Sequence, residues 1–187
     1  MREVIPEIIP PEHWTERKTL RHARNLLGKH LVCRGAAFLI TEVEAYDGEK
    51  DLACHAARGK TPRNEVMYGP AGHWYVYLCY GMHEMLNLVV GPTGWPAAVL
   101  IRGVEGLTGP GRLTRALGID RSLNRRPALP QSGLHVEDRG VRVPARLVRA
   151  TARIGVAYAG PEWAGKPWRF TFDPRALPSR RPALGPK

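Results

Sequence analysis

Short strand-like runs joined by tight turns, with little helical sequence between them, restrict most strongly how this chain can fold. Apolar and aromatic residues dominate 74–80, 85–90 and 97–104, and glycine-containing turns separate these runs. Two earlier runs, 30–33 and 38–46, flank an Arg-Gly turn. Antiparallel strands can follow one another through such turns, whereas parallel strands need a long crossover connection. The pattern therefore favours an antiparallel or mixed curved sheet over a doubly wound parallel one.

Helical sequence is confined to two short stretches. Thr15 is a suitable N-cap for a helix that reaches about Leu27 and ends at Gly28, because leucines and an alanine line one side of that stretch. A glycine-rich turn at Gly109 opens a second short helix. The other predicted segments are polar loops at 47–73 and 121–140 and a closing strand at 166–172.

The length of 187 residues fits one domain with a full hydrophobic core. We predict a single domain over 1–187, with an extended arm at 1–14 and a flexible, basic, proline-rich tail at 174–187. The N-terminus lacks the residue series of a signal peptide, and no apolar run is long enough to cross a membrane. Three cysteines without a CxxC spacing suit a reducing compartment. We therefore expect a cytoplasmic protein without membrane contact.

Positive charge is concentrated in the second part of the chain. Residues 1–109 carry 12 basic and 12 acidic side chains, whereas residues 110–187 carry 16 basic and five acidic ones, so the whole net charge of +11 lies after residue 109. Most of these cations are arginines, which can bind a phosphate through two parallel hydrogen bonds. The asymmetry favours a polyanionic partner such as nucleic acid, and the alternative is an arginine-rich solvated surface.

Two carboxylates in the run 38–46 are candidates for a catalytic base. Strand alternation places Ile40, Glu42, Glu44 and Tyr46 on one face. A carboxylate beside an aromatic ring suits an enzyme that stacks a flat ring and activates water next to it. Glu42 and Glu44 compete for this role with the simpler interpretation of a solvated or arginine-paired strand residue. The adjacent tyrosine favours Glu44.

The same region suggests a metal site as an alternative. Carboxylates and a histidine could hold a metal ion and make the chain a metal-dependent nuclease. These candidate ligands are Glu42, Glu44, Asp47, Asp51 and His55. Their spacing matches no established metal motif, and phosphate-binding and dinucleotide-binding motifs are absent. We therefore predict neither a metal nor another cofactor.

An aromatic run, HWYVYLCYG, carries one Trp and three Tyr. Alternation places Tyr75 and Tyr77 on one face and Trp74 on the other. Such a strand is equally typical of a buried core. Tyr80 differs, because it precedes Gly81 at a bend where its ring can protrude. An exposed ring beside a basic surface could wedge into a base stack and open a duplex.

Two basic, glycine-containing stretches are candidates for contact with a nucleic-acid backbone. HAARGKTPRN places Arg58, Lys60 and Arg63 among Gly and Pro, and LTGPGRLTRAL places Arg112 and Arg115 in the second helix. Exposed backbone amides and cations suit phosphate, although solvated loops often have this composition. We expect the arginines between residues 112 and 153 mainly to contact phosphates.

Five collinear stretches of the chain match one known family. They are NLLGKHLV, TEVEAYDGEKDLACHAARGKTPRNEVMYGPAGHWYVYLCYGMHEMLNLV, AAVLIRGVEG, TGPGRLTRALGID and RIGVAYAGPEWAGKPWRF. They resemble the alkyladenine (3-methyladenine) DNA glycosylases of the alkylpurine repair type, and the block at 41–87 is highly specific. The resemblance implies a single-domain α+β fold with a curved, mainly antiparallel sheet and flanking helices. It also implies excision of damaged purines that are flipped out of duplex DNA.

Carried over by motif position, the resemblance implies roles for seven residues. Glu44 would orient and deprotonate the attacking water, and Arg102 would help to hold that water. Tyr80 would fill the vacated place in the DNA helix. The residues that would surround the flipped purine are Tyr46, His55, Tyr77 and Asn87.

The resulting hypothesis is a monofunctional glycosylase, expected to be a monomer, that acts on double-stranded DNA containing damaged purines. Candidate substrates are 3-methyladenine, 7-methylguanine, hypoxanthine and ethenoadenine. No lysine stands where an imine-forming nucleophile is expected, so base release without strand cleavage is predicted. The alternatives are a non-catalytic nucleic-acid-binding module, in which tyrosines only stack bases, and the metal-dependent nuclease.

Overall fold

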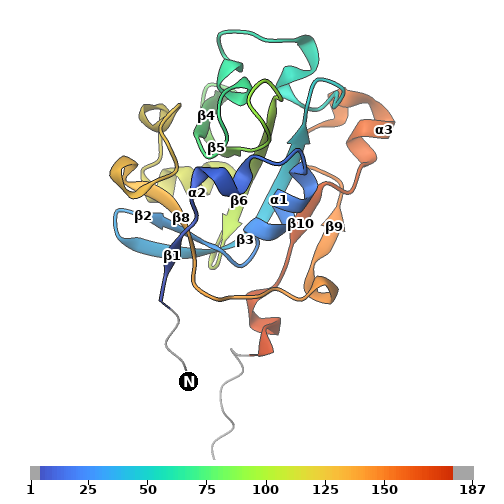
Figure 1. The fold of residues 1–187 in the computed structure, drawn as a ribbon. Coiled ribbons are helices and arrows are strands. Elements are labelled where there is room, and N and C mark those ends of the chain that lie inside the picture. The colour runs from blue at the N-terminus through green and yellow to red at the C-terminus, as the bar shows by residue number, and fades with distance from the viewer. Residues whose placement is uncertain (1–4, 179–187) are drawn as a thin grey trace, which may run out of the picture.

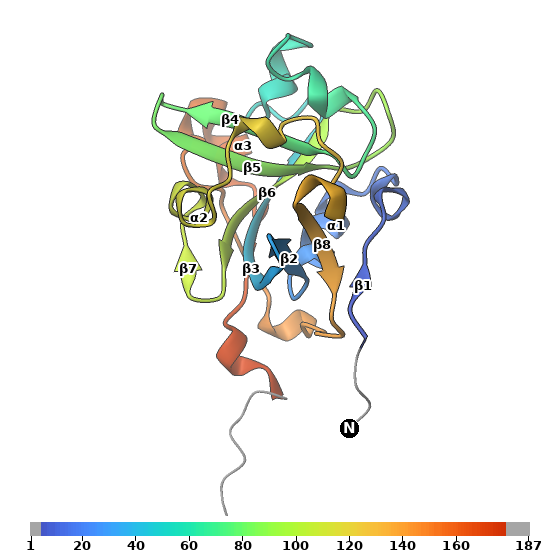
Figure 2. The ribbon, with the colours of Figure 1, turned by 90° about the vertical axis from the view of Figure 1, so that its left-hand side faces the viewer.

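An antiparallel sheet runs through the described part of the chain, residues 5–178 of a computed structural model (Figure 1). Its strands are β1 (Glu7–Ile8), β2 (His30–Cys33), β3 (Ala36–Asp47), β4 (Trp74–Cys79), β5 (His83–Val89), β6 (Ala97–Val104), β7 (Leu107–Thr108), β8 (Leu134–Asp138), β9 (Arg149–Thr151) and β10 (Arg169–Thr171). The main order is β1-β8-β2-β3-β6-β5-β4; β10 pairs with β3 and β9, and β7 pairs with β6. These pairings are all antiparallel. The curled sheet and its flanking helices confirm the predicted α+β fold (Figure 2).

The helices are short and lie against the sheet. They are α1 (Thr19–Leu26), α2 (Pro110–Leu117) and α3 (Gly160–Gly165), with the 3-10 turns η1 (Pro11–Trp14), η2 (His55–Arg58), η3 (Glu65–Tyr68), η4 (Arg121–Leu123), η5 (Pro130–Ser132), η6 (Ala145–Leu147), η7 (Ala157–Ala159) and η8 (Pro174–Ala176). Pro110 begins α2 and Gly118, with a left-handed φ of 59°, ends it. Across residues 5–178, no helix has the length and apolar character needed to cross a membrane.

The central strands β3, β6, β5 and β4 separate two layers of side chains. The main core lies on one face, where Leu26 of α1 and Leu113 of α2 pack with Val43, Val76 and Leu88 of the strands. Each side chain of this size contributes roughly 1.5–3 kcal/mol when fully buried. The other face is covered by the loop at 47–73 and the segment at 153–164, and it carries the candidate site residues.

Cross-strand pairing aligns several of these residues in one row. Tyr75 of β4 pairs with Asn87 of β5, Asn87 pairs with Leu100 of β6, and Leu100 pairs with Glu44 of β3. Directly paired residues of antiparallel strands project to the same side of the sheet. The sheet register thus brings β3, β5 and β4 to one surface despite their separation in the sequence.

The predicted start of the first helix is wrong. The helix begins at Thr19, after an N-cap at Lys18 that makes no side-chain capping bond. Thr15 instead ends η1 in a right-handed helical conformation, and its hydroxyl donates to the Glu12 carbonyl at 2.9 Å. The η1 turn buries Trp14, which is 1% exposed, and this anchor keeps Thr15 from the extended conformation that an N-cap needs.

The loop predicted at 121–140 contains a strand. β8 pairs with β2 on one side and β1 on the other. Leu134 and Val136 of this strand are buried in the main core. The apolar signal was too short to distinguish β8 from the polar residues around it, and its partners come from distant parts of the chain.

The ends of the described region contact the domain more closely than an arm and a tail would. Ile9 and Trp14 are buried, within the segment predicted as an arm. At the other end η8 follows β10, and Leu177 is 2% exposed in the main core. The tail predicted at 174–187 is therefore wrong for 174–178, and 179–187 lie outside the described residues, as do 1–4 of the arm.

Candidate active site

Glu44 lies in β3 with its side chain on the face away from the main core, and none of it is exposed (0%). Its Oε1 accepts a hydrogen bond from the Ile154 backbone N–H at 2.8 Å. Its Oε2 accepts bonds from the Tyr46 hydroxyl at 2.8 Å and from Arg102 Nη1 at 3.3 Å. A carboxylate offers about four acceptor positions, so these three donors leave one position for a water. The arrangement suits the anionic form.

Arg102 links the two carboxylates that compete for the role of base. Its neighbours on β6 pair with Glu42 and Val43, so Arg102 is the extra residue of a bulge. A bulge can redirect a side chain, and Arg102 donates to Glu42 Oε1 at 2.9 Å as well as to Glu44. Glu42 also accepts a bond from Arg169 Nε at 2.6 Å. Glu42 is thus held by two arginines, whereas Glu44 meets the tyrosine hydroxyl.

The irregular ladder corrects one sequence prediction. Ile40 is predicted to share a face with Glu42 and Glu44, but it packs in the main core with Val43. Register shifts occur on both sides of Glu42 in the β3–β6 ladder, and a bulge changes the face to which the preceding residues point. Simple alternation fails for Ile40 but correctly places Tyr46 beside Glu44.

Aromatic side chains gather next to Glu44 on the same face. The ring of Tyr77 lies 4.5 Å from that of His55 and 5.2 Å from that of Tyr75, measured between centroids. Tyr46, Tyr75 and Tyr77 belong to one small apolar cluster. Burial, and then the Glu44 carboxylate, raise the pKa of Tyr46, so its hydroxyl stays protonated and donates to that carboxylate. The sequence-predicted residues Tyr46, His55 and Tyr77 therefore lie together.

His55 is held at the start of η2, with its Nδ1 2.8 Å from the Tyr75 hydroxyl. Desolvation by the surrounding protein, and then the nearby Arg63 guanidinium, lower the pKa of His55 from 6.5 to about 4. The ring is consequently neutral at physiological pH. A neutral imidazole can pack against a cationic purine without charge repulsion.

The lowered pKa of His55 predicts a pH-dependent stability. The unfolded chain binds a proton at His55 below about pH 6.5 and the folded chain only near pH 4, so the stabilisation is present above pH 6.5 and lost as the pH falls to 4. The free energy of unfolding in urea should fall between pH 7.0 and pH 4.5 in both the wild type and His55→Gln. The fall should be smaller in His55→Gln than in the wild type, because glutamine does not bind a proton in this range. Equal losses in both proteins would contradict the lowered pKa of His55.

Asn87 is buried in β5 at 3% exposure. Its amide nitrogen donates to the backbone carbonyls of Tyr75 at 3.1 Å and Met85 at 3.2 Å. These bonds fix the orientation of the side chain and commit its nitrogen to the strands. The Oδ1 atom is therefore the one with which Asn87 can accept a hydrogen bond from an amino group.

Tyr80 occupies the bend between β4 and β5, at the tip of a hairpin that reaches beyond the body of the molecule (Figure 2). It has a left-handed φ of 49° and is 82% exposed. A non-glycine residue in this conformation is uncommon. The neighbouring Met82 is 68% exposed. The tip therefore presents unpaired apolar surface, as the sequence predicts for Tyr80.

The segment around Ile154 and Tyr158, which lies next to Glu44, was given no role from the sequence. Ile154 supplies the backbone donor to Glu44, and its side chain is 52% exposed. Tyr158 is 69% exposed, and its hydroxyl donates to the Ala53 carbonyl at 2.9 Å. The only sequence signal for these residues was their place in the matched stretch RIGVAYAG, because a backbone N–H donor has no residue-type signature.

A buried ion pair beside the site was also missed. Arg153 and Asp51 both have fully buried side chains and are joined by two hydrogen bonds of 2.6 and 2.8 Å. Although burial opposes it, the Asp51 carboxylate raises the pKa of Arg153. The guanidinium lies 4.8 Å from the ring centre of Tyr46 and donates to the Ala45 carbonyl. The prediction that the arginines of 112–153 contact phosphates is therefore wrong for Arg153.

Each of the five candidate metal ligands has a protein partner. Glu42 and Glu44 share Arg102, Asp51 binds Arg153, and Asp47 accepts bonds from Thr19 and Trp95, while His55 meets Tyr75. Within residues 5–178 no group of three His, Cys, Asp or Glu side chains could hold a metal ion. The geometry favours an organic ring beside a carboxylate over a metal centre.

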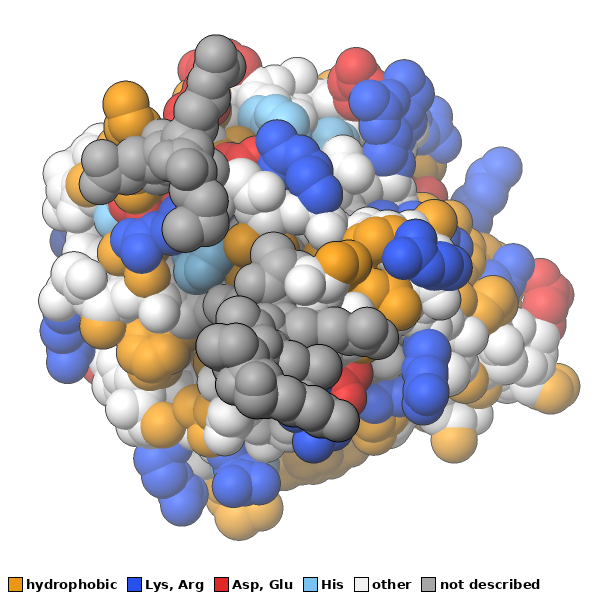
Figure 3. Space-filling model, turned by 90° about the horizontal axis from the view of Figure 1, so that it is seen from below, with side chains coloured by type: hydrophobic (Ala, Val, Ile, Leu, Met, Phe, Trp, Pro, Cys, Tyr) orange, Lys and Arg blue, Asp and Glu red, His pale blue; other side chains and the backbone are white. Residues whose placement is uncertain are grey.

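The basic candidates for DNA contact are exposed but do not form one cluster. Arg58, Lys60 and Arg63 lie in the loop above the β4–β5 hairpin, and Arg112 and Arg115 lie on α2 below it (Figure 2). On the face seen from below, basic side chains are spread singly among apolar and uncharged groups (Figure 3). Net charge alone therefore does not identify the DNA-binding surface.

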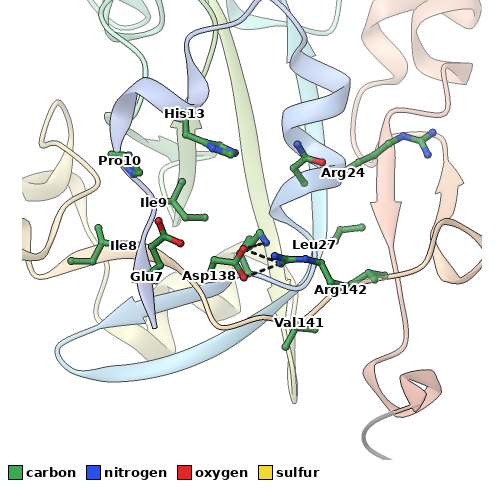
Figure 4. A pocket seen from close by; sticks show the side chains of 13 residues that line it. Glu7, Ile8, Ile9, Pro10, His13, Arg24, Leu27, Asp138, Val141 and Arg142 are labelled. Carbon is green, nitrogen blue, oxygen red and sulfur yellow. Dashed lines mark hydrogen bonds and ion pairs between the residues drawn. The ribbon is translucent and has the colours of Figure 1, made fainter. Parts of the chain in front are cut away.

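A cavity of about 370 Å³ lies away from Glu44, between the first strand, α1 and residues 138–143 (Figure 4). At its base Asp138 accepts bonds from Lys29 at 2.7 Å and Arg142 at 2.9 Å. These pairs neutralise the charge of Asp138 and link β8 to the start of β2. No candidate site residue contributes to it.

Comparison with known proteins places these features in one family. The model of the family described as methylpurine-DNA glycosylase (MPG) matches residues 13–108 and 105–176. A protein of Myxococcus xanthus is 49% identical over 188 residues, covering 94% of this chain and 95% of that protein. One of Nitrosococcus oceani is 41% identical over 202 residues, covering 98% of each. Both relatives carry the name "Putative 3-methyladenine DNA glycosylase".

Proposed function

Because the chain belongs to the methylpurine-DNA glycosylase family, we propose that it hydrolyses the N-glycosidic bond of alkylated purines flipped out of duplex DNA and leaves an abasic site. The observation that carries the proposal is the contact between the buried Glu44 carboxylate and the hydroxyl of Tyr46, on the face that also holds His55 and Tyr77. This contact sets a base next to rings that can stack a purine.

Glu44 is the proposed catalytic base. Its remaining acceptor position would bind the attacking water, while Arg102, Tyr46 and the Ile154 N–H hold the carboxylate still. Breaking the glycosidic bond builds positive charge on the sugar, which an adjacent carboxylate stabilises. Arg102 would also help to hold the water, since it is anchored from behind by Glu42.

The aromatic residues are proposed to hold the purine. Alkylation at N3 or N7 makes the purine cationic, and tyrosine faces attract such a ring by about 0.5–2 kcal/mol. A cationic purine is already a good leaving group, so the site needs no strong acid. His55 would pack on the ring in its neutral form, and Asn87 Oδ1 would accept from the purine's amino edge. We propose release of the base without strand cleavage.

Incubation with duplexes that each carry one lesion tests this function. We expect release of 3-methyladenine or 7-methylguanine as the free base from the wild-type protein, and chromatography of the released purine identifies which of the four candidate lesions is accepted. An undamaged duplex of the same sequence is the control. Failure to release any of the lesions would refute the glycosylase and leave the non-catalytic binding module.

Tyr80 is proposed to fill the space that the flipped purine leaves. Tyr80→Ala should weaken binding to a lesion duplex by about 1–3 kcal/mol, the usual worth of one base–aromatic stack, and should leave excision from a single strand unchanged. Tyr80→Phe, which keeps the ring, should bind like the wild type. Fluorescence anisotropy and single-strand excision check this pair, and equal losses on both substrates would remove the wedge role.

A further inference from the structure

The outer edge of β4 is the open end of the sheet, because β4 pairs as a strand only with β5 in the described region. The segment after α2 covers part of this edge. Trp74 N–H donates to the Arg126 carbonyl at 2.8 Å, and Val76 N–H donates to Asn124 Oδ1 at 3.1 Å. Residues 124–126 therefore accept hydrogen bonds from the outward-facing N–H groups of β4 as far as Val76, and from none beyond it.

A notch of about 320 Å³ opens where this cover ends. It is lined by Pro62, Arg63, Val76, Tyr77, Leu78, Arg121 and Asn124. Since Trp74 and Val76 direct their N–H groups outward, strand alternation turns the Leu78 N–H to the same edge. Arg63 Nη2 donates to the Leu78 carbonyl at 2.9 Å, which holds its guanidinium at the notch.

The polar groups at the notch are mainly donors. Arg121 is 60% exposed and donates its Nε–H to Glu84 at 3.0 Å, so its terminal N–H groups face solvent. With the guanidinium of Arg63 and the Leu78 N–H, these groups offer several hydrogen-bond donors. Glu84 pairs with Arg121, and the charge of Arg63 is left unpaired by any carboxylate that lines the notch. A fork of guanidinium donors matches the oxygens of a phosphate. No carboxylate lines the notch, and the partner of Arg121, Glu84, engages only its Nε–H.

The position of the notch points to a phosphate of the DNA backbone rather than a free ion. Leu78 lies in β4 only two residues before Tyr80, so the notch lies beside the tip of the hairpin that carries Tyr80. Resting on the proposed function, we infer that Arg63, Arg121 and the Leu78 N–H bind one backbone phosphate close to the place that Tyr80 fills.

A methylphosphonate scan tests this site. Wild-type protein and Arg121→Ala are bound to a duplex with a central abasic-site analogue, in which one phosphate at a time is replaced by an uncharged methylphosphonate. We expect the wild type to lose about tenfold in affinity at one position near the abasic site. Arg121→Ala should bind the native duplex about tenfold more weakly and lose less than the wild type at that position, because only Arg63 and the Leu78 N–H still contact the phosphate.

Two further variants make the result specific. Arg146→Ala removes an exposed arginine of η6 on a distant part of the molecule and should keep the full position dependence of the wild type (Figure 1). The double variant Glu84→Gln, Arg121→Ala excludes repulsion by an unpaired Glu84, and it should behave like Arg121→Ala. The site is refuted if every methylphosphonate has the same effect on wild type and Arg121→Ala. Base release by the wild type, scored separately on lesion duplexes, distinguishes this failure from failure of the glycosylase.

Discussion

Replacement of Glu44 by glutamine is expected to slow purine excision by about 10²–10⁴-fold, the usual contribution of a positioned acid or base. The substitution keeps the shape of the side chain but removes the charge and the basic oxygen. One carboxylate oxygen becomes an NH₂ group that faces a donor, which adds a cost in stability of about 1–3 kcal/mol. Single-turnover excision from a methylpurine duplex measures the rate.

Binding separates the catalytic role of Glu44 from a structural one. Glu44→Gln should bind a duplex with an abasic-site analogue with an affinity close to that of the wild type, because the aromatic face and the hairpin tip are unchanged. Glu49→Gln is the matched control, since Glu49 is an exposed carboxylate five residues along the chain that meets Tyr68. It should excise at the wild-type rate. Undiminished excision by Glu44→Gln would remove the assigned base.

Loss of the Arg153–Asp51 pair is expected to give the largest loss of stability. Removing one partner of a buried pair leaves an uncompensated charge and costs about 3–5 kcal/mol. Here both side chains have no exposed surface. At about 2–4 °C per kcal/mol for a chain of this size, Arg153→Met should lower the unfolding midpoint by roughly 6–20 °C. Thermal denaturation followed by circular dichroism measures this shift.

Two control variants show whether the loss of stability in Arg153→Met comes from the buried pair. Arg175→Met breaks the exposed pair with Asp173 and should leave the midpoint unchanged. Asp51→Asn combined with Arg153→Met removes both charges and should recover part of the stability. A midpoint for Arg153→Met equal to that of Arg175→Met would show that the buried pair contributes nothing. Since Arg153 lies over Tyr46, the variant tests the support of the site as well.

Local sequence patterns predicted the hairpin strands and the site face well, because the signals act between neighbouring residues. Alternation placed Tyr75 and Tyr77 together and opposite Trp74, as their separate clusters confirm. Gly81 marked the bend at which Tyr80 protrudes. Turn residues and strand period depend on a few adjacent positions, which a sequence displays directly.

The missed features depend on distant parts of the chain. The pair of Arg153 and Asp51 joins residues 102 positions apart, and Ile154 reaches Glu44 across 110 positions. In neither pair does the local sequence around one residue identify its partner. The bulge that turns Arg102 toward both carboxylates was equally invisible, because it arises from register with β3 and not from the β6 sequence itself. Register and burial are tertiary properties.

A crystal structure of Glu44→Gln bound to a duplex with one 7-methylguanine tests the central claim most directly. The account predicts that the damaged base lies outside the helix, with Tyr46 against its ring, His55 and Tyr77 close by, and the sugar's anomeric carbon facing residue 44. Tyr80 should occupy the vacated position. A lesion that remains stacked in the duplex, or that sits away from residue 44, would contradict the account.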